Sequence, residues 1–194
     1  MAQLSIYQAR IGRTQGARLS FLKLLASPEN DPRKEAARLW DLWLNAERRA
    51  GQGRYDDAVA RLYRLLEWTA QWLLEQKGVC TSDLAPEQIP PGLEIPPNRD
   101  GKRQAWLVVA WELVANHVGG AAAEFDAAER NRMRNHLLVR NSSILAHGER
   151  PINQKDWDAF SGWIEQALLQ LLEREAKSAG FRMRPAQLPV RAIW

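Results

Sequence analysis

The chain has 194 residues, a length that fits one ordinary domain with a buried core. Hydrophobic residues make up 45% of it and charged residues 26%, and these proportions argue against a disordered chain. The formal net charge is +4, and 21 of the 27 basic residues are arginine, whose planar guanidinium suits acidic partners such as RNA but is also common on solvated helix faces.

Cysteine content and hydropathy limit the cellular setting. Because Cys80 is the single cysteine, neither an intramolecular disulfide nor a thiolate metal cluster can form, which fits a reducing cytoplasm. No apolar run approaches the roughly 18 residues that a membrane span needs. We therefore expect a cytoplasmic protein without a membrane partner.

Three segments are expected along the chain. Residues 1–30 are predicted to be a basic N-terminal segment or a linker from a missing domain, since residues 1–28 carry basic side chains and no acid. Transit peptides share that pattern, although no other targeting feature accompanies it. Residues 31–180 are predicted to form a helical domain, and residues 181–194 a basic C-terminal tail.

Two long helices are predicted in the first half of the domain. Asp31 is a favourable N-cap, Pro32 suits the first turn, and the first helix ends by Gly51. A second helix is predicted over residues 55–78. Both helices place apolar residues three to four positions apart, as core-facing helices do. These residues are Trp40, Trp43, Leu44, Val59, Leu62, Tyr63, Leu66, Ala70 and Leu73.

A proline-rich loop separates these helices from the rest of the chain. The loop, residues 80–101, carries five prolines, which exclude a helix. A third helix is predicted from about Lys102 to Val118, with glycines at its end. A fourth is predicted to begin near Asp126.

The last predicted helix begins after Asn153. Asn153 and Asp156 have the spacing of a capping box, and the apolar face runs from Trp157 to Leu172 before Gly180 ends the helix. No segment alternates apolar and polar residues as a half-buried strand does. The predicted fold is therefore all-α, a bundle of about five helices with no substantial sheet.

Three histidines are candidates for chemistry: His117, His136 and His147. No two of them have the four-residue spacing of a helical metal site. No glycine-rich phosphate loop follows a predicted strand either. We therefore expect neither a metal nor a cofactor.

Two of the histidines follow an arginine at a similar spacing. In RNSSILAHGER, Arg140 precedes His147 by seven positions, and two helical turns return nearly to the same face. Arg130 precedes His136 by six positions, which places them about 120° apart around a helix. Spacing alone does not choose between a catalytic pair and two ordinary helix-surface residues.

The first pair suits RNA cleavage without a metal. A second copy of the same helix across a twofold axis would bring two arginines and two histidines together. Histidine titrates near neutrality, so it can take the 2′-hydroxyl proton or protonate the leaving oxygen. Arginine can stabilise the negative charge of the phosphorane.

These residues resemble a known family. The stretch RNSSILAHG is similar to the active-site signature of HEPN ribonucleases, in which arginine, often followed by a polar residue such as asparagine, is separated from histidine by four to six intervening residues. Residues 46–78, AERRAGQGRYDDAVARLYRLLEWTAQWLLEQKG, look like the helical HEPN region of CRISPR-associated CARF–HEPN proteins.

The resemblance implies a function and a site. It implies a helical homodimer whose paired signatures form a composite, metal-independent endoribonuclease site for single-stranded RNA, in CRISPR-linked antiviral defence. Its catalytic residues would be Arg140, Asn141 and His147. In that family a CARF domain senses cyclic oligoadenylate. This chain has neither the length nor the predicted strands for one, so such a sensor is expected in a longer or partner chain, if the domain does not act alone.

The second arginine–histidine pair is interpreted differently. Arg130, Asn131 and His136 fit the same loose pattern but lack the LAHG context. We expect them to lie on the solvated or RNA-contacting side of the preceding helix.

Two other functions stay open at this point. One is a catalytically silent helical module that dimerises or holds RNA or a protein, for which the basic residues of 130–140 and of the tail would suffice. The other is a HEPN toxin paired with an antitoxin. Loss of RNA cleavage on substitution of His147 would separate the enzyme from the silent module.

Overall fold

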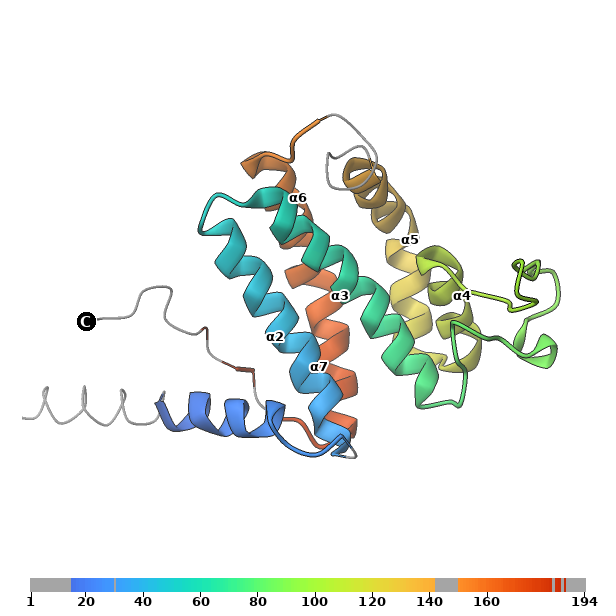
Figure 1. Ribbon diagram of the computed structural model, residues 1–194, viewed down its shortest axis with the longest axis horizontal. Helices are drawn as coiled ribbons and strands as arrows, with labels where there is room; N and C mark the ends of the chain where they lie inside the picture. The colour runs from blue at the N-terminus through green and yellow to red at the C-terminus, as the bar shows by residue number, and fades with distance from the viewer. Residues whose placement is uncertain (1–14, 30, 142–149, 183, 186, 188–194) are drawn as a thin grey trace, which may run out of the picture.

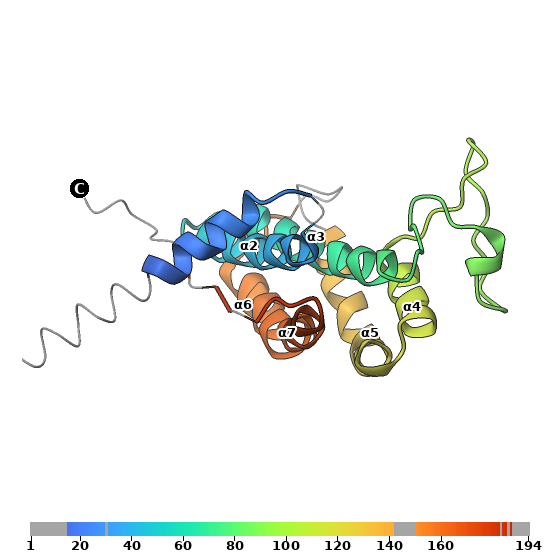
Figure 2. The same ribbon diagram turned by 90° about the horizontal axis from the view of Figure 1, so that it is seen from below.

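The helices of the computed structural model pack in two layers (Figure 1, Figure 2). The structure describes residues 15–29, 31–141, 150–182, 184–185 and 187. Helices α2 (Pro32–Ala50) and α3 (Tyr55–Glu75) lie side by side in one layer. The second layer holds α4 (Leu107–His117), α5 (Gly120–Asn141), α6 (Gln154–Trp163) and α7 (Leu169–Ser178). No strand occurs among the described residues, and the predicted all-α class is confirmed.

The last predicted helix is one helical stretch with an irregular middle. Helix α6 continues directly into a π-helical turn, η2 (Ile164–Leu168), which continues into α7. Taken as one helix, this stretch makes up the predicted set of five together with α2, α3, α4 and α5. Residues 15–25 form a further helix inside the predicted N-terminal segment.

Helix starts follow the capping signals of the sequence. The Asp31 side chain accepts a hydrogen bond from the Arg33 backbone N–H at 2.9 Å, and the Arg33 guanidinium lowers the pKa of that carboxyl to about 2. Asn153 caps α6 by accepting from the Asp156 N–H at 3.1 Å, while the Asp156 carboxylate accepts from the Asn153 N–H at 3.2 Å. Both predicted N-caps are therefore confirmed.

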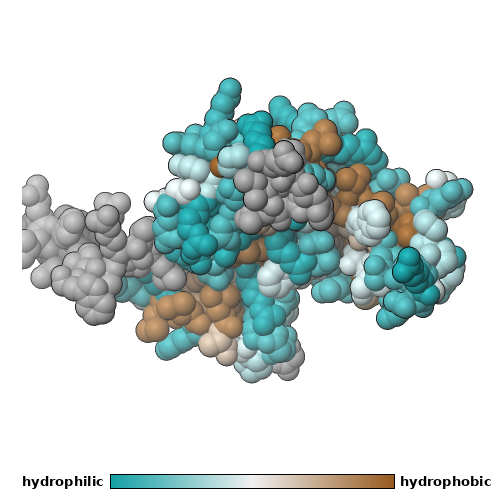
Figure 3. Space-filling model, turned by 45° about the horizontal axis from the view of Figure 1, so that its top comes forward, coloured by the Kyte–Doolittle hydropathy of each residue, from teal (hydrophilic) through white to brown (hydrophobic). Residues whose placement is uncertain are grey.

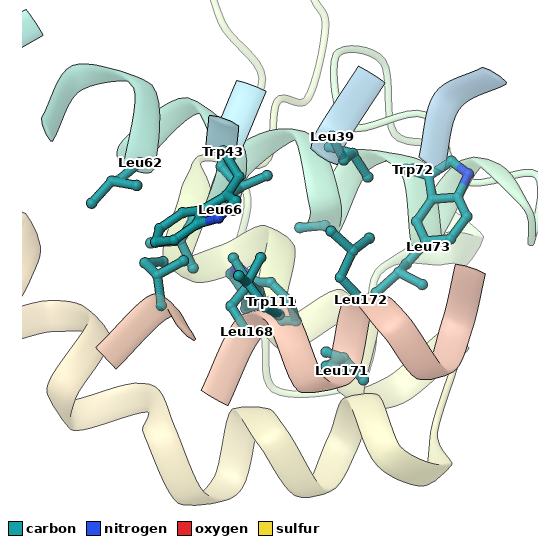
Figure 4. Packing of buried hydrophobic residues seen from close by; sticks show 14 of the residues in the cluster. Leu39, Trp43, Leu62, Leu66, Trp72, Leu73, Trp111, Leu168, Leu171 and Leu172 are labelled. Carbon is teal, nitrogen blue, oxygen red and sulfur yellow. The ribbon is translucent and has the colours of Figure 1, made fainter. Parts of the chain in front are cut away.

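The core forms where the apolar faces of the two layers meet (Figure 4). Side chains from α2, α3 and the α6–α7 stretch point toward one another there. The fully buried residues include the following: Leu39, Trp40, Leu62, Leu66, Trp111, Leu168 and Leu172. The face that the sequence assigned to the core in α2 and α3 is thus the face that packs, apart from Tyr63, which is only half-buried.

Two predicted helix boundaries are wrong. The third helix begins at Leu107 rather than near Lys102, because the preceding residues are extended and bond to the other end of the loop. The Leu84 N–H donates to the Arg103 carbonyl at 2.9 Å, and the Ala105 N–H donates to the Thr81 carbonyl at 2.8 Å. These contacts hold the chain out of a helical conformation until α4 starts.

Helix α5 begins six residues earlier than predicted. Gly119 and Gly120, at φ values of 70° and 52°, reverse the chain after α4, and α5 starts at Gly120. Asp126 is consequently an interior residue of the helix rather than a residue at its start. Its side chain is buried, so it needs a partner inside the fold.

The described part of the predicted C-terminal tail lies on α2. The Gln187 side chain donates to the Leu44 carbonyl at 2.9 Å, and Arg184 pairs with Glu165 at 3.1 Å. Phe181 is buried against the core. These contacts join the segment to the bundle.

On the face shown in Figure 3 the described surface is mostly hydrophilic, with hydrophobic residues gathered in a few patches. Four large hydrophobic side chains are exposed among the described residues: Leu19, Leu22, Trp106 and Leu138. Within that part of the chain, no helix combines the length and the apolar character of a membrane span.

Candidate functional site

Arg140 and Asn141 form the last turn of α5. The Arg140 guanidinium lies over the ring of Tyr63 in α3, with 4.4 Å between the guanidinium carbon and the ring centroid. Its Nη1 donates a hydrogen bond to the Asn141 Oδ1 at 3.1 Å. Among the described residues no carboxylate forms an ion pair with Arg140. Of the five N–H donors of the guanidinium, the described residues engage the one that bonds to Asn141.

The ring beneath Arg140 is a neutral one. Tyr63 is half-buried, and burial raises the pKa of its phenol, with a further rise from Glu67 and an opposing effect from Arg140. The phenol is therefore uncharged near neutral pH. Its face offers the negative end of the ring quadrupole to the guanidinium, a contact of about 0.5–2 kcal/mol in proteins.

The predicted histidine lies outside the described residues. His147 and its LAHG context fall in the undescribed stretch 142–149. The pairing of His147 with Arg140, and the shared helix face on which that pairing was argued, therefore stay predictions. What the structure does describe is the chain on either side of this stretch.

Both flanks of the stretch contact the same face of α3. Before it, Arg140 stacks on Tyr63. After it, the Ile152 N–H donates to the Asp56 Oδ1 at 3.1 Å, and Ile152 is buried. Asp56 and Tyr63 are seven residues apart in one helix, so they lie on nearly the same side of it. Arg150 is tied in addition to Asp156 at 3.0 Å.

The second arginine is a structural residue, which corrects its predicted place on the solvated or RNA-contacting side. Arg130 forms a close ion pair with Asp126, whose side chain is 3% exposed, and reaches Glu112 at 3.5 Å. The ion pair with Asp126 raises the pKa of Arg130. Asn131 is exposed, as predicted for that side of the helix.

The second histidine is half-buried rather than on the solvated side of the helix. The His136 ring stacks on Phe160 at 4.6 Å between centroids and on Trp163 at 5.1 Å. Burial lowers the pKa of the imidazole, and Arg132 lowers it further. A neutral ring in an aromatic stack packs α5 against α6 and has no exposed acid–base role.

His136 gives folding stability a pH dependence. Its folded pKa lies below the unfolded value of 6.5, so its contribution is complete above that pH and is lost as the pH falls toward the folded pKa. In His136→Phe the ring stays but cannot take up a proton. Urea unfolding at pH 7.5 and pH 5 should show a smaller fall in unfolding free energy for the variant than for the wild type. Equal falls in both proteins would contradict this.

The third histidine fastens the proline-rich loop. The His117 Nε2–H donates to the Gln88 carbonyl at 2.7 Å, which joins the end of α4 to a short 3₁₀ turn, η1 (Pro86–Gln88). A carbonyl only accepts, so this nitrogen carries the proton. Both histidines that lie among the described residues, His117 and His136, are thus engaged in structural contacts.

Two residues beside the candidate site, Tyr63 and Asp56, were not singled out from the sequence. Tyr63 has the spacing of a core residue in its helix, which conceals its second role. Its partner Arg140 is 77 positions away in the sequence. Asp56 accepts a hydrogen bond from the backbone N–H of Ile152, a residue that belongs to no recognisable sequence motif. No local signal in the chain identifies either contact.

A metal centre has no support among the described residues. No group of three or more histidine, cysteine, aspartate or glutamate side chains is arranged to hold an ion there. The chemistry of the described part of the site comes from a guanidinium, an amide and a phenol ring. Such groups bind and stabilise an anion.

Comparison with known proteins assigns the family. The family model described as Csm6 HEPN domain matches residues 28–171, well over half of the chain, and this match includes Arg140 and Asn141. No curated protein and no solved structure matches the chain. The chain therefore belongs to the Csm6 HEPN domain family of CRISPR-associated proteins, the family that its signature resembles.

Proposed function

We propose that the protein is a metal-independent endoribonuclease of the HEPN type that cleaves single-stranded RNA in CRISPR-linked antiviral defence in the cytoplasm. The proposed catalytic residues are Arg140, Asn141 and His147. Membership of the family supports a ribonuclease of this class. Beyond the ribonuclease class, we propose the catalytic residues, the reaction and a dimeric assembly.

One observation carries the choice of residues. The chain offers two arginine–histidine pairs, and Arg130 and His136 are both engaged in structural contacts. The Arg140 guanidinium instead lies over the aromatic ring of Tyr63, and among the described residues no carboxylate forms an ion pair with it. An arginine in that setting suits a phosphate ligand.

The proposed reaction needs only groups of the protein and the RNA. The 2′-oxygen attacks the adjacent phosphorus and loses its proton, and the bond from phosphorus to the 5′-oxygen breaks. His147 takes the first proton or supplies one to the leaving 5′-oxygen. Arg140 stabilises the charge on the phosphorane, and Asn141 orients Arg140 through its Oδ1. The products are a 2′,3′-cyclic phosphate and a 5′-hydroxyl.

The described contacts hold the chain on either side of the stretch that carries His147. His147 is three positions before Arg150, and such a length of chain spans at most about 11 Å. Arg150 is tied to Asp156, and Ile152 to Asp56 on the helix that also carries Tyr63.

We propose that two copies of the chain build the site. Leu138 is exposed one turn before Asn141, and Arg134 is exposed one turn before Leu138, on one side of α5. An isologous contact through this face would bring the two α5 ends together around a twofold axis. The exposed apolar side chain one turn before Asn141 supports that arrangement.

The function is tested with unstructured RNA in EDTA. We expect the wild type to cleave it equally well with EDTA and with Mg²⁺, and to leave 2′,3′-cyclic phosphate ends detectable by mass spectrometry. The same oligonucleotide with 2′-deoxy residues should stay intact, because the attacking hydroxyl is missing. Cleavage that EDTA abolishes, or cleavage of the deoxy strand, would contradict the proposed chemistry.

The same assay separates the other candidate functions. Retention of RNA without cleavage would favour the silent binding module. If a cyclic oligoadenylate sensor controls the domain from a longer or partner chain, cleavage should rise when that ligand and chain are added. Inhibition by the product of a neighbouring gene would favour the toxin of a toxin–antitoxin pair.

A further inference from the structure

Tyr63 contacts both the hydrophobic core and the guanidinium of a candidate catalytic arginine. It packs against the hydrophobic core on one side, as its position in α3 requires. The other part of the ring lies under the Arg140 guanidinium at 4.4 Å, across the gap between two helices that are remote in sequence. The ring is therefore a fixed support with one face directed at a candidate catalytic group.

Stacking restricts the guanidinium to one plane. An arginine side chain has several rotatable bonds, and its donors all point outward in the plane of the guanidinium. The Arg140 guanidinium carbon lies over the Tyr63 ring at 4.4 Å from its centroid, and Asn141 accepts a hydrogen bond from Nη1 at 3.1 Å. The other edge donors are then held in one orientation, which suits two oxygens of a phosphate.

The same helix holds the chain beyond the histidine. Asp56, two turns before Tyr63 on the same side of α3, accepts from the Ile152 N–H at 3.1 Å. Because a helix is stiff over two turns, the distance between these two anchors is fixed. Both sides of the candidate site thus take their positions from one surface.

We propose that Tyr63 is a positioning residue for RNA cleavage, which orients the Arg140 guanidinium toward the scissile phosphate through its ring. The proposal rests on the proposed function and deepens it. Tyr63 itself need not touch the RNA. The ring carries the effect, because the recorded contact is between the ring face and the guanidinium, so the hydroxyl is dispensable.

The test compares Tyr63→Leu with Tyr63→Phe in the full chain. Loss of the ring leaves Arg140 free to turn, so kcat for RNA cleavage should fall roughly 10- to 100-fold in the leucine variant. The loss should fall on kcat rather than on KM, since Arg140 acts on charge that develops in the reaction. The phenylalanine variant keeps the ring, so it should stay within about threefold of the wild type.

A matched control lies five residues further along α3. Arg64 stacks over Trp68 at 5.4 Å, so Trp68→Leu removes a comparable ring from beneath an arginine outside the site. Its kcat should stay near that of the wild type. Tyr63→Leu combined with Arg140→Lys should be no slower than Arg140→Lys alone, because Tyr63 acts through the guanidinium.

The outcomes separate the two proposals. If the wild type cleaves RNA and Arg140→Ala does not, an unchanged kcat in Tyr63→Leu overturns the positioning role and leaves the function standing. A loss in Tyr63→Phe as large as in Tyr63→Leu also overturns it, because the ring would then not be sufficient. No cleavage by the wild type, under conditions in which its activator has been supplied, overturns the function and the positioning role together.

Discussion

Arg140→Ala should lower kcat for RNA cleavage by about 100- to 1,000-fold, and His147→Ala by a comparable factor. Removing a donor that stabilises developing charge usually costs that much in a site that excludes water. Thermal unfolding followed by circular dichroism should show little change for Arg140→Ala, since the lost stacking contact is at the surface of the bundle. Gel-based cleavage rates under single-turnover conditions measure the effect on the chemical step.

Arg130→Ala is the matched control for this prediction. It removes an arginine from the same helix, but it leaves Asp126 buried without its partner. An unpaired buried group of this kind costs about 1–3 kcal/mol of folding stability, so the melting temperature should fall by several degrees. The folded fraction should still cleave RNA. A catalytic loss in Arg130→Ala with unchanged stability would reverse the assignment of the two pairs.

Leu138→Glu should separate the proposed dimer and remove most of the cleavage activity. In an isologous contact the two new carboxylates would approach each other near the axis, and such a like-charge contact costs several kcal/mol. The dissociation constant of the dimer should rise by at least about 100-fold. Sedimentation velocity reports the change in mass, and cleavage assays at the same concentrations report its effect on the site.

An equally exposed leucine outside this face provides the comparison. Leu19 is 54% exposed and Leu138 is 68% exposed, so neither substitution disturbs a buried core. Leu19→Glu should leave the mass and the cleavage rate as in the wild type. A dimer that survives Leu138→Glu, or an active monomer, would exclude a composite site at this face of α5.

Local signals made the helices predictable. Asp31 and Asn153 begin their helices because each side chain accepts a hydrogen bond from a nearby backbone N–H, which involves only neighbouring residues. The apolar spacing in α2 and α3 identified the packing face for the same reason. The end of α5 at Arg140 and Asn141 was likewise expected to be helical.

Contacts between distant segments were not predictable. The start of α4 depends on hydrogen bonds between residues near 81–84 and 103–105, which no local propensity records. His136 was placed in solvent because its aromatic partners come from α6, more than 20 residues away. The support of Arg140 by Tyr63 required knowledge of which helices meet. Residue types and spacing suggested the site. Only the tertiary packing distinguished Arg130, which pairs with a buried carboxylate, from Arg140, which lies over an aromatic ring.

The π-helical turn η2 lets the last helical stretch hold one residue more than a regular helix of the same number of turns. Such a turn contains one residue more than an α-helical turn would, and each residue rotates an α-helix by about 100°. Removal of one residue between Ile164 and Leu168 would therefore leave a regular helix in which α7 keeps its phase relative to α6. Leu171 and Leu172 would stay in the core with Trp157 and Phe160. The same deletion within α6 or α7 would instead put one half of the stretch out of phase with the bundle, so η2 is the place where a change of length is easiest to accommodate.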